Sequence, residues 1–171
     1  TPHHFTLTHA ECASYDPVFK VNPPLRTADD VAAVRAGLAD GTIAAIATDH
    51  APHAPETKEL PFDQAPPGML GLETALALAL TELDLPIGQV LAALSWGPAR
   101  ILGIGDVHGA VAEGRPANLC VIDPEVTWTV RGADMASRST NTPYEGREVR
   151  GRVRHTLLHG EAVVLGSEAQ R

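Results

Sequence analysis

Apolar residues recur at helical spacing at one place early in the chain, between residues 27 and 40. Such spacing puts the side chains on one face of a helix. Thr27 can cap the first turn, Asp30 stands at the capping-box position, and Gly41 suits a helix end. We therefore predict a helix over 27–40. Its apolar positions are Val31, Val34 and Leu38.

A short apolar run without alternation follows at once, over residues 42–48. This pattern predicts a strand covered on both faces, ending at Asp49. A helix followed by a buried strand and a long loop is typical of a parallel α/β fold. Functional side chains in such folds gather where strands end. The proline-rich loop over 50–69 is long enough to predict a functional loop.

The pattern of residues changes at about residue 105. We therefore divide the chain into one part over 1–104 and a second over 105–171. Glycine, proline and aspartate separate short strand-like pieces there, so we predict a small β-rich segment with a frayed tail over 166–171. Before the change we expect three helices, over 72–83, 87–95 and 98–102. After it we expect strands over 117–123, 127–130, 153–158 and 162–165.

Composition narrows the class of protein. The 171 residues are 44% hydrophobic and 20% charged, as in a folded domain, and the net charge of -8 argues against a nucleic-acid surface. No apolar stretch is long enough to span a membrane, no signal peptide opens the chain, and the two cysteines stand alone. We expect a reduced, cytoplasmic protein without nucleic-acid or membrane partners. Because Thr1 stands first with no element before it, we also expect the chain to begin within a fold.

The densest group of ionisable side chains is Thr48-Asp49-His50-Ala51-Pro52-His53. A carboxylate at a strand end, with histidines one and four residues later, offers a metal ligand, a general base and a substrate-binding donor. The alternative is a capped loop in which Asp49 bonds backbone amides and the histidines face solvent. Spacing alone leaves both interpretations open.

Three further segments carry candidate residues. Asn22, stiffened by Pro23 and Pro24, could bind a planar cyclic amide or simply form a turn before the helix. Gly68, after two prolines, permits a close backbone approach to a ligand but equally suits a tight turn. His3 and His4 are adjacent; on an extended segment they would point to opposite sides, so they form an awkward pair for one metal ion, and the alternative is a packed and a solvated imidazole.

Several motifs, in this order, together resemble the bacterial type of dihydroorotase in the amidohydrolase superfamily. The likeness covers nearly the whole chain, although Asn118 stands where aspartate is commoner. The motifs are TPHH at 1–4, VNPPLR at 21–26, ATDHAPH at 47–53, PGMLGLET at 67–74, GRPANL at 114–119 and NTPY at 141–144.

The resemblance implies the C-terminal part of a metal-dependent hydrolase TIM (β/α)8 barrel followed by a small β-rich composite domain. It implies zinc, one or two ions, at the C-terminal mouth of the barrel strands. By the same resemblance Asp49 binds metal and serves as general acid and base. Asn22, His53 and the backbone of Pro67 and Gly68 hold the substrate. His3 and His4 lie near the site without being metal ligands.

The activity implied is the reversible cyclisation of N-carbamoyl-L-aspartate to dihydroorotate in pyrimidine biosynthesis. The family's other metal ligands, including a His-x-His pair, precede TPHH, and this sequence contains no His-x-His. A barrel needs about 250 residues, so we expect the chain to be inactive alone. Expected partners are a second copy or aspartate transcarbamoylase. The alternatives are an allantoinase or hydantoinase, a non-catalytic dihydroorotase-like partner of aspartate transcarbamoylase, and a fragment without an independent role.

Overall fold

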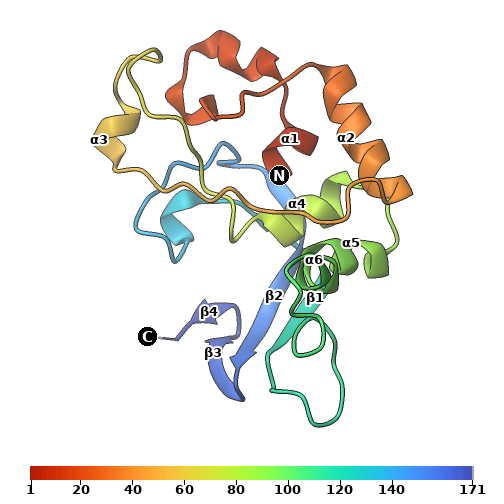
Figure 1. Cartoon of the computed structure of the whole chain (residues 1–171). Helices are drawn as coiled ribbons and strands as arrows, with labels where there is room; N and C mark the ends of the chain where they lie inside the picture. Colours follow the sequence, from red (N-terminus) through yellow and green to blue (C-terminus); the bar gives the residue numbers. More distant parts are fainter. Residues whose placement is uncertain (171) are drawn as a thin grey trace.

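Helices and loops make up the first part of the molecule and a single sheet the last part (Figure 1). The computed structural model describes residues 1–170. Its helices are α1 (Pro2–Thr6), α2 (Ala28–Asp40), α3 (Pro55–Lys58), α4 (Ala75–Glu82), α5 (Ile87–Leu94) and α6 (Trp96–Ile101), with short 3-10 turns at η1 (His9–Ser14), η2 (Pro17–Phe19) and η3 (Gly132–Asp134). Its strands are β1 (Leu119–Thr129), β2 (Glu148–Leu158), β3 (Glu161–Leu165) and β4 (Glu168–Ala169), all antiparallel in the order β1-β2-β3-β4.

Helix α2 confirms the first prediction. The Thr27 hydroxyl accepts a hydrogen bond from the Asp30 amide, and the Asp30 carboxylate accepts one from the Thr27 amide. This capping box satisfies two backbone donors at the helix start. At the other end Gly41 adopts φ 83°, a left-handed conformation in which glycine carries no steric penalty.

The strand predicted over 42–48 is absent from the described structure. The segment runs without strand assignment, and only Ile46 within it is buried. A strand requires a neighbour to bond, and here the recorded backbone bonds reach helices instead: Ile43 donates to Gly37 and Ile46 donates to Ala93. The apolar composition thus predicted a buried strand, whereas most of the segment is at least partly exposed.

The helices that follow are close to those predicted. Helix α5 agrees within one residue, α6 begins two residues before the predicted start, and α4 begins three residues after it. Before α4, the amides of Gly71 and Leu72 donate to the ring of His50, which gives these two groups a partner outside the helix. No helix within residues 1–170 is long and apolar enough to cross a membrane.

The sheet is more continuous than predicted. The pieces expected over 117–123 and 127–130 belong to one strand, β1, whose register with β2 shifts between Asp123 and Thr127. Pro124 falls in this shift, where a residue without an amide donor is tolerated. Strand β2 begins at Glu148, five residues before its predicted start. The prediction of a frayed tail is wrong for residues 166–170, since β4 pairs with β3. Arg171 lies outside the described residues.

The two halves of the chain share one core. The apolar cluster contains Phe5 and Leu78 from the helical part together with Val149 of β2 and Val130, which directly follows β1. Helix α4 packs against β2, and both lie at the centre of the molecule (Figure 1). Burial of these apolar side chains is the main contribution that stabilises the packing of the helical part against the sheet.

Two ion pairs lie at the same junction between the helical part and the sheet. Glu82 of α4 is 15% exposed and pairs with Arg35 of α2 and with Arg147, which precedes β2. Arg35 also donates to the carbonyl of Phe5 at 2.7 Å. One carboxylate therefore holds two cations that come from opposite ends of the chain.

We expect Glu82→Ala to lower the free energy of unfolding by about 1–3 kcal/mol, because it leaves two partly buried guanidinium groups without their partner. Urea unfolding of the protein measures this loss. As a control, Glu125→Ala removes a carboxylate that is 78% exposed beside Arg150, and the change should stay within about 0.5 kcal/mol. Equal effects of the two substitutions would contradict the role given to Glu82.

Candidate active site

Asp49 combines an unusual backbone with an accessible side chain. Its φ is 49°, a left-handed conformation that is uncommon outside glycine and that recurs at functional sites. The side chain is 44% exposed, and among residues 1–170 its carboxylate accepts no hydrogen bond from a backbone amide. The interpretation of Asp49 as a loop cap is therefore wrong. A carboxylate held this way is available to a ligand.

His3 is the nearest ionisable neighbour recorded for Asp49. It is 2% exposed, and its Nε2 lies 3.8 Å from Asp49 Oδ2. Burial, followed by the positive charges of His4 and the amino group of Thr1, lowers the pKa of His3 from 6.5 to about 3. The ring facing Asp49 is therefore neutral near pH 7.

The expectation that His3 and His4 point to opposite sides of an extended segment is wrong. Both lie in α1, where Pro2 occupies the first position and presets the helical φ. Their ring centres are 4.5 Å apart. Successive helical residues diverge less than successive strand residues, so both rings reach the same region.

His50 and His53 have different surroundings, although both follow Asp49. The Nδ1 of His50 accepts hydrogen bonds from the amides of Gly71 (3.1 Å) and Leu72 (3.3 Å), which ties the ring to the start of the next segment. His53 Nε2 lies 3.0 Å from the carbonyl of Pro67. A carbonyl can only accept, so Nε2 is the donor, and in the neutral ring Nδ1 remains an acceptor.

Gly68 is fixed by close contacts in the predicted binding loop. Its φ is 142°, and a Cβ added here would lie 2.6 Å from His53 Nε2 and 2.7 Å from Ala51 Cβ. The loop can therefore pass beside His53 only because position 68 lacks a side chain. Its amide donates to the carbonyl of Lys20 at 2.8 Å. The structure thus brings together Pro67, Gly68 and His53, three of the residues that the resemblance assigns to substrate binding.

Asn22 stands on an exposed turn between two buried anchors, Val21 and Leu25. The next residues approach α1, since His4 Nε2 lies 3.1 Å from the carbonyl of Pro23 and 3.3 Å from that of Pro24. The turn therefore lies against the histidines beside Asp49. No contact between the side chains of Asn22 and Asp49 is recorded among residues 1–170.

Asn141 organises the loops around the site, and sequence reasoning missed this role. It is 7% exposed, its Oδ1 accepts from the amide of His53, and its Nδ2 donates to the carbonyls of Ala51 (3.0 Å) and Gly68 (3.3 Å). Its own carbonyl accepts from the amide of Leu70. The sequence contained one signal for this residue, the motif at 141–144 that is part of the family resemblance. That motif does not indicate which loops Asn141 contacts.

Lys58 is a second residue that the sequence did not single out. Its ammonium group donates to the carbonyls of Pro17 (2.8 Å) and Pro66 (2.9 Å), so it holds the loop before Gly68 against η2. Burial, together with the positive charge of nearby Lys20, lowers the pKa of Lys58 from 10.5 to about 8. The residues around Lys58 in the sequence do not indicate that its side chain bonds the carbonyls of Pro17 and Pro66.

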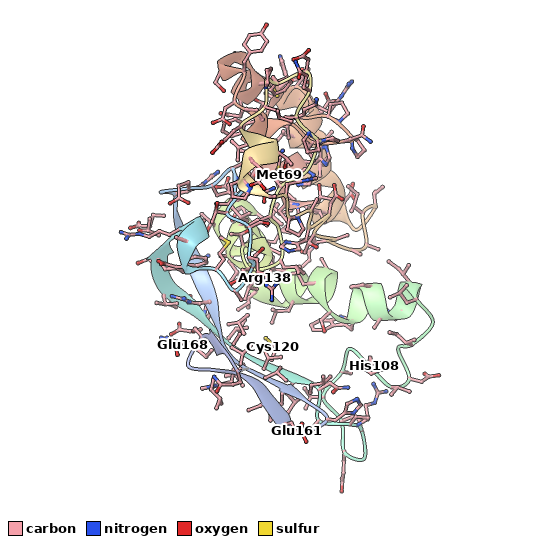
Figure 2. The ribbon with its side chains drawn as sticks, turned by 90° about the vertical axis from the view of Figure 1, so that its left-hand side faces the viewer. Met69, His108, Cys120, Arg138, Glu161 and Glu168 are labelled. Carbon is pink, nitrogen blue, oxygen red and sulfur yellow. The ribbon has the colours of Figure 1, made fainter. Side chains whose placement is uncertain are left out.

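The site lies toward the helical end of the molecule. In Figure 2, Met69, next to Gly68, is labelled among the loops there, whereas Cys120, Glu161 and Glu168 mark the sheet. Neither Cys12 nor Cys120 forms a disulfide in the described structure. Within residues 1–170 no three His, Cys, Asp or Glu side chains come close enough to hold a metal ion. The unbonded carboxylate of Asp49 suits zinc as a single ligand, and further ligands would have to come from outside these residues.

Residues 19–163 match the amidohydrolase family. The chain belongs to this family. Its likeness to dihydroorotases spans nearly its whole length: it is 51% identical to that of Streptomyces coelicolor, over 96% of this chain and 40% of the relative, and 48% identical to that of Mycobacterium leprae, over 99% of this chain and 40% of the relative. The chain thus spans about 40% of the length of these curated relatives.

Solved structures in the same superfamily have the same arrangement of helices and sheet. An L-hydantoinase (dihydropyrimidinase) from Arthrobacter aurescens superposes with a TM-score of 0.89 at 27% identity, covering 99% of this chain and 39% of that protein. A D-hydantoinase (dihydropyrimidinase) from Thermus sp. gives a TM-score of 0.87 at 26% identity, covering 98% of this chain and 39% of that protein. These likenesses support the prediction of an amidohydrolase with mixed helices and strands, and the stated resemblance to dihydroorotases is confirmed.

We expect Asn141→Ala to lower the free energy of unfolding by about 2–3 kcal/mol, because it leaves an amide and two carbonyls of the site loops without their partner. Chemical denaturation of the protein measures the loss. Gln64→Ala, which truncates an exposed side chain of similar size, serves as the control. A cost for Asn141→Ala no larger than for Gln64→Ala would show that water replaces the three bonds.

Lys58 predicts a pH dependence of stability. Its folded pKa lies near 8 and its unfolded pKa near 10.5, so the folded state holds this proton less tightly. Stability should therefore rise with pH between those values, as the penalty of the buried charge is relieved. We expect the free energy of unfolding of the native protein, minus that of Lys58→Met, to increase from pH 8 to pH 10.5. A flat or falling difference in urea titrations would contradict this.

Proposed function

We propose that this amidohydrolase chain is the C-terminal part of a dihydroorotase and carries its proton-transferring carboxylate, Asp49. The observation that carries the proposal is the position of Asp49, exposed, strained in its backbone and unbonded to amides, at the start of the loop that also holds His53. Identities of 48–51% to dihydroorotases give the substrate class.

The apolar segment over 42–48, which has no strand assignment in this chain, would pair as one strand of a (β/α)8 barrel in the full-length protein. Its recorded backbone bonds to helices leave most of its edge available, and an unpaired edge is the natural place for a neighbouring strand. The relatives are more than twice as long as this chain, and a barrel requires about 250 residues. We propose that residues 1–104 complete such a barrel and that 105–171 belong to a small composite β domain.

Asp49 would hold zinc together with ligands from the rest of the barrel, with one or two ions in all. When bound, zinc supplies a Lewis acid for the ring carbonyl and lowers the pKa of a coordinated water. The carboxylate of Asp49 fits this role because nothing in residues 1–170 competes for it by donating a backbone hydrogen bond.

The same carboxylate would move the proton of the reaction. As the water oxygen attacks the ring carbonyl of dihydroorotate, Asp49 takes the proton that the water loses. When the carbon–nitrogen bond breaks, Asp49 delivers this proton to the departing amide nitrogen, which yields N-carbamoyl-aspartate. The reverse sequence closes the ring. Both hydrogens of the water are thus accounted for, because one reaches the amide nitrogen through Asp49 and the other leaves with the new carboxylic acid, which ionises near neutral pH.

The neighbouring groups would hold the substrate. Nε2 of His53 is used in its bond to Pro67, so Nδ1 is the ring nitrogen that would accept from the substrate. Asn22 offers an exposed amide that can both donate and accept. Pro67 and Gly68 would line the substrate site beside His53, and because their carbonyls already accept from His53 and Asn141, a substrate donor would use the second lone pair of a carbonyl. Fixed groups of this kind accelerate a reaction through positioning.

Asp49→Asn in the full-length protein should lower kcat for dihydroorotate hydrolysis about a thousandfold, because an amide cannot carry the proton. Asn22→Ala should act mainly on binding and raise KM about tenfold. The measurement is ring opening followed by ultraviolet absorbance. Asp84→Asn makes the same chemical change at an exposed position outside the site and serves as the control.

Substrate choice separates this proposal from its rivals. Hydantoin, allantoin and dihydrouracil are assayed beside dihydroorotate; turnover of one of these in its place would assign the chain to a sister cyclic amidohydrolase. No turnover, combined with stable binding to aspartate transcarbamoylase, would indicate a non-catalytic partner. Near-normal hydrolysis by Asp49→Asn would remove Asp49 from its role. A second copy and aspartate transcarbamoylase remain the predicted partners.

A further inference from the structure

A short series of polar contacts connects the two loops that carry Asp49 and Asn22. The hydroxyl of Thr1 lies 2.8 Å from Nε2 of His3 and 2.7 Å from Nδ1 of His4. The other nitrogen of His4 lies 3.1 Å from the carbonyl of Pro23, directly after Asn22. Nε2 of His3 lies 3.8 Å from the carboxylate of Asp49.

The directions of these hydrogen bonds follow from the carbonyl at one end. A carbonyl accepts only, so Nε2 of His4 carries the proton, and in the neutral ring Nδ1 of His4 must accept. The Thr1 hydroxyl therefore donates its single hydrogen to His4. Its oxygen is then left to accept from His3, which places the proton of His3 on Nε2.

The Nε2–H of His3 is directed at the Thr1 hydroxyl at 2.8 Å, and the same nitrogen lies 3.8 Å from Asp49 Oδ2. At that distance the N–H acts on the carboxylate as a nearby dipole and not as a hydrogen-bond donor. The ring is 2% exposed, so it has little freedom to turn. Asp49 has no competing hydrogen bond from a backbone amide in the part of the chain that the structure describes. An oriented N–H in a buried ring attracts a carboxylate more strongly than the same group in water would.

We propose that His3 is a positioning residue for Asp49, oriented through the hydroxyl of Thr1 by His4. The proposal rests on the proposed function of Asp49. The series sets where the carboxylate stands relative to the turn that carries Asn22, because the turn is bonded to His4 and the carboxylate lies beside His3. It also gives the adjacent histidines a role that requires neither of them to bind metal.

Thr1→Val in the full-length protein tests the series without removing either ring. Valine keeps the branched shape of threonine but has no hydroxyl, so His3 loses the partner that fixes its proton. We expect kcat to fall about tenfold or more, since small misplacements of a reacting group are costly, while KM changes less than about threefold. Thr1→Ser restores the hydroxyl and should recover most of the lost kcat.

Thr6→Val is the matched control for damage to the helix. Thr6 lies in the same helix, and its hydroxyl bonds the carbonyl of Pro2 and the hydroxyl of Tyr144 rather than any group at Asp49. We expect this variant to lose thermal stability and keep kcat. Equal losses of kcat in Thr1→Val and Thr6→Val would overturn the proposal, as would a loss in Thr1→Val that matches a loss of bound zinc.

Ring nitrogen NMR provides a readout that does not depend on turnover. In the full-length protein we expect the neutral tautomer protonated at Nε2 for both His3 and His4, and a mixture of tautomers for His3 in Thr1→Val. A His3 ring protonated at Nδ1 in the native protein would overturn the proposal. Native protein without dihydroorotase activity would instead refute the proposed function, so the two failures are distinguishable.

Discussion

The arrangement of the site depends on one constraint: loops that lie outside any sheet must find partners for their backbone groups elsewhere. Asn141 meets most of this need, since its amide side chain bonds an amide and two carbonyls from the loops at 51–53 and 68. His50 and Lys58 serve the same purpose on either side. The loops owe their shape to these three side chains together with a parallel bridge between His50 and Met69.

Against this background Asp49 is the exception. Neighbouring polar groups are committed to structural bonds, whereas its carboxylate accepts no backbone bond among residues 1–170 and its backbone occupies a left-handed conformation. The left-handed backbone has a free-energy cost that folding alone gives no reason to retain. A carboxylate positioned for a ligand accounts for this backbone conformation.

Local chemistry made some features predictable. The capping box at Thr27 and Asp30, the glycine at position 41 and the helix over 87–94 depend on neighbouring residues, and the sequence displayed them. The strand over 42–48 depends on a partner, so composition could not decide it. The contacts of Asn141 and Lys58 span long stretches of sequence, which no spacing reveals. The meeting of His53 with Gly68 was expected only through family resemblance.

Asn141 belongs to the connection between β1 and β2, so the sheet and the catalytic loops are mechanically continuous. A shift of the sheet would pull on the amide of His53 and the carbonyl of Gly68 together, without passing through the intervening helices. A substitution in the connection between the two strands would therefore be felt at positions 51, 53 and 68 together, because one side chain bonds all three.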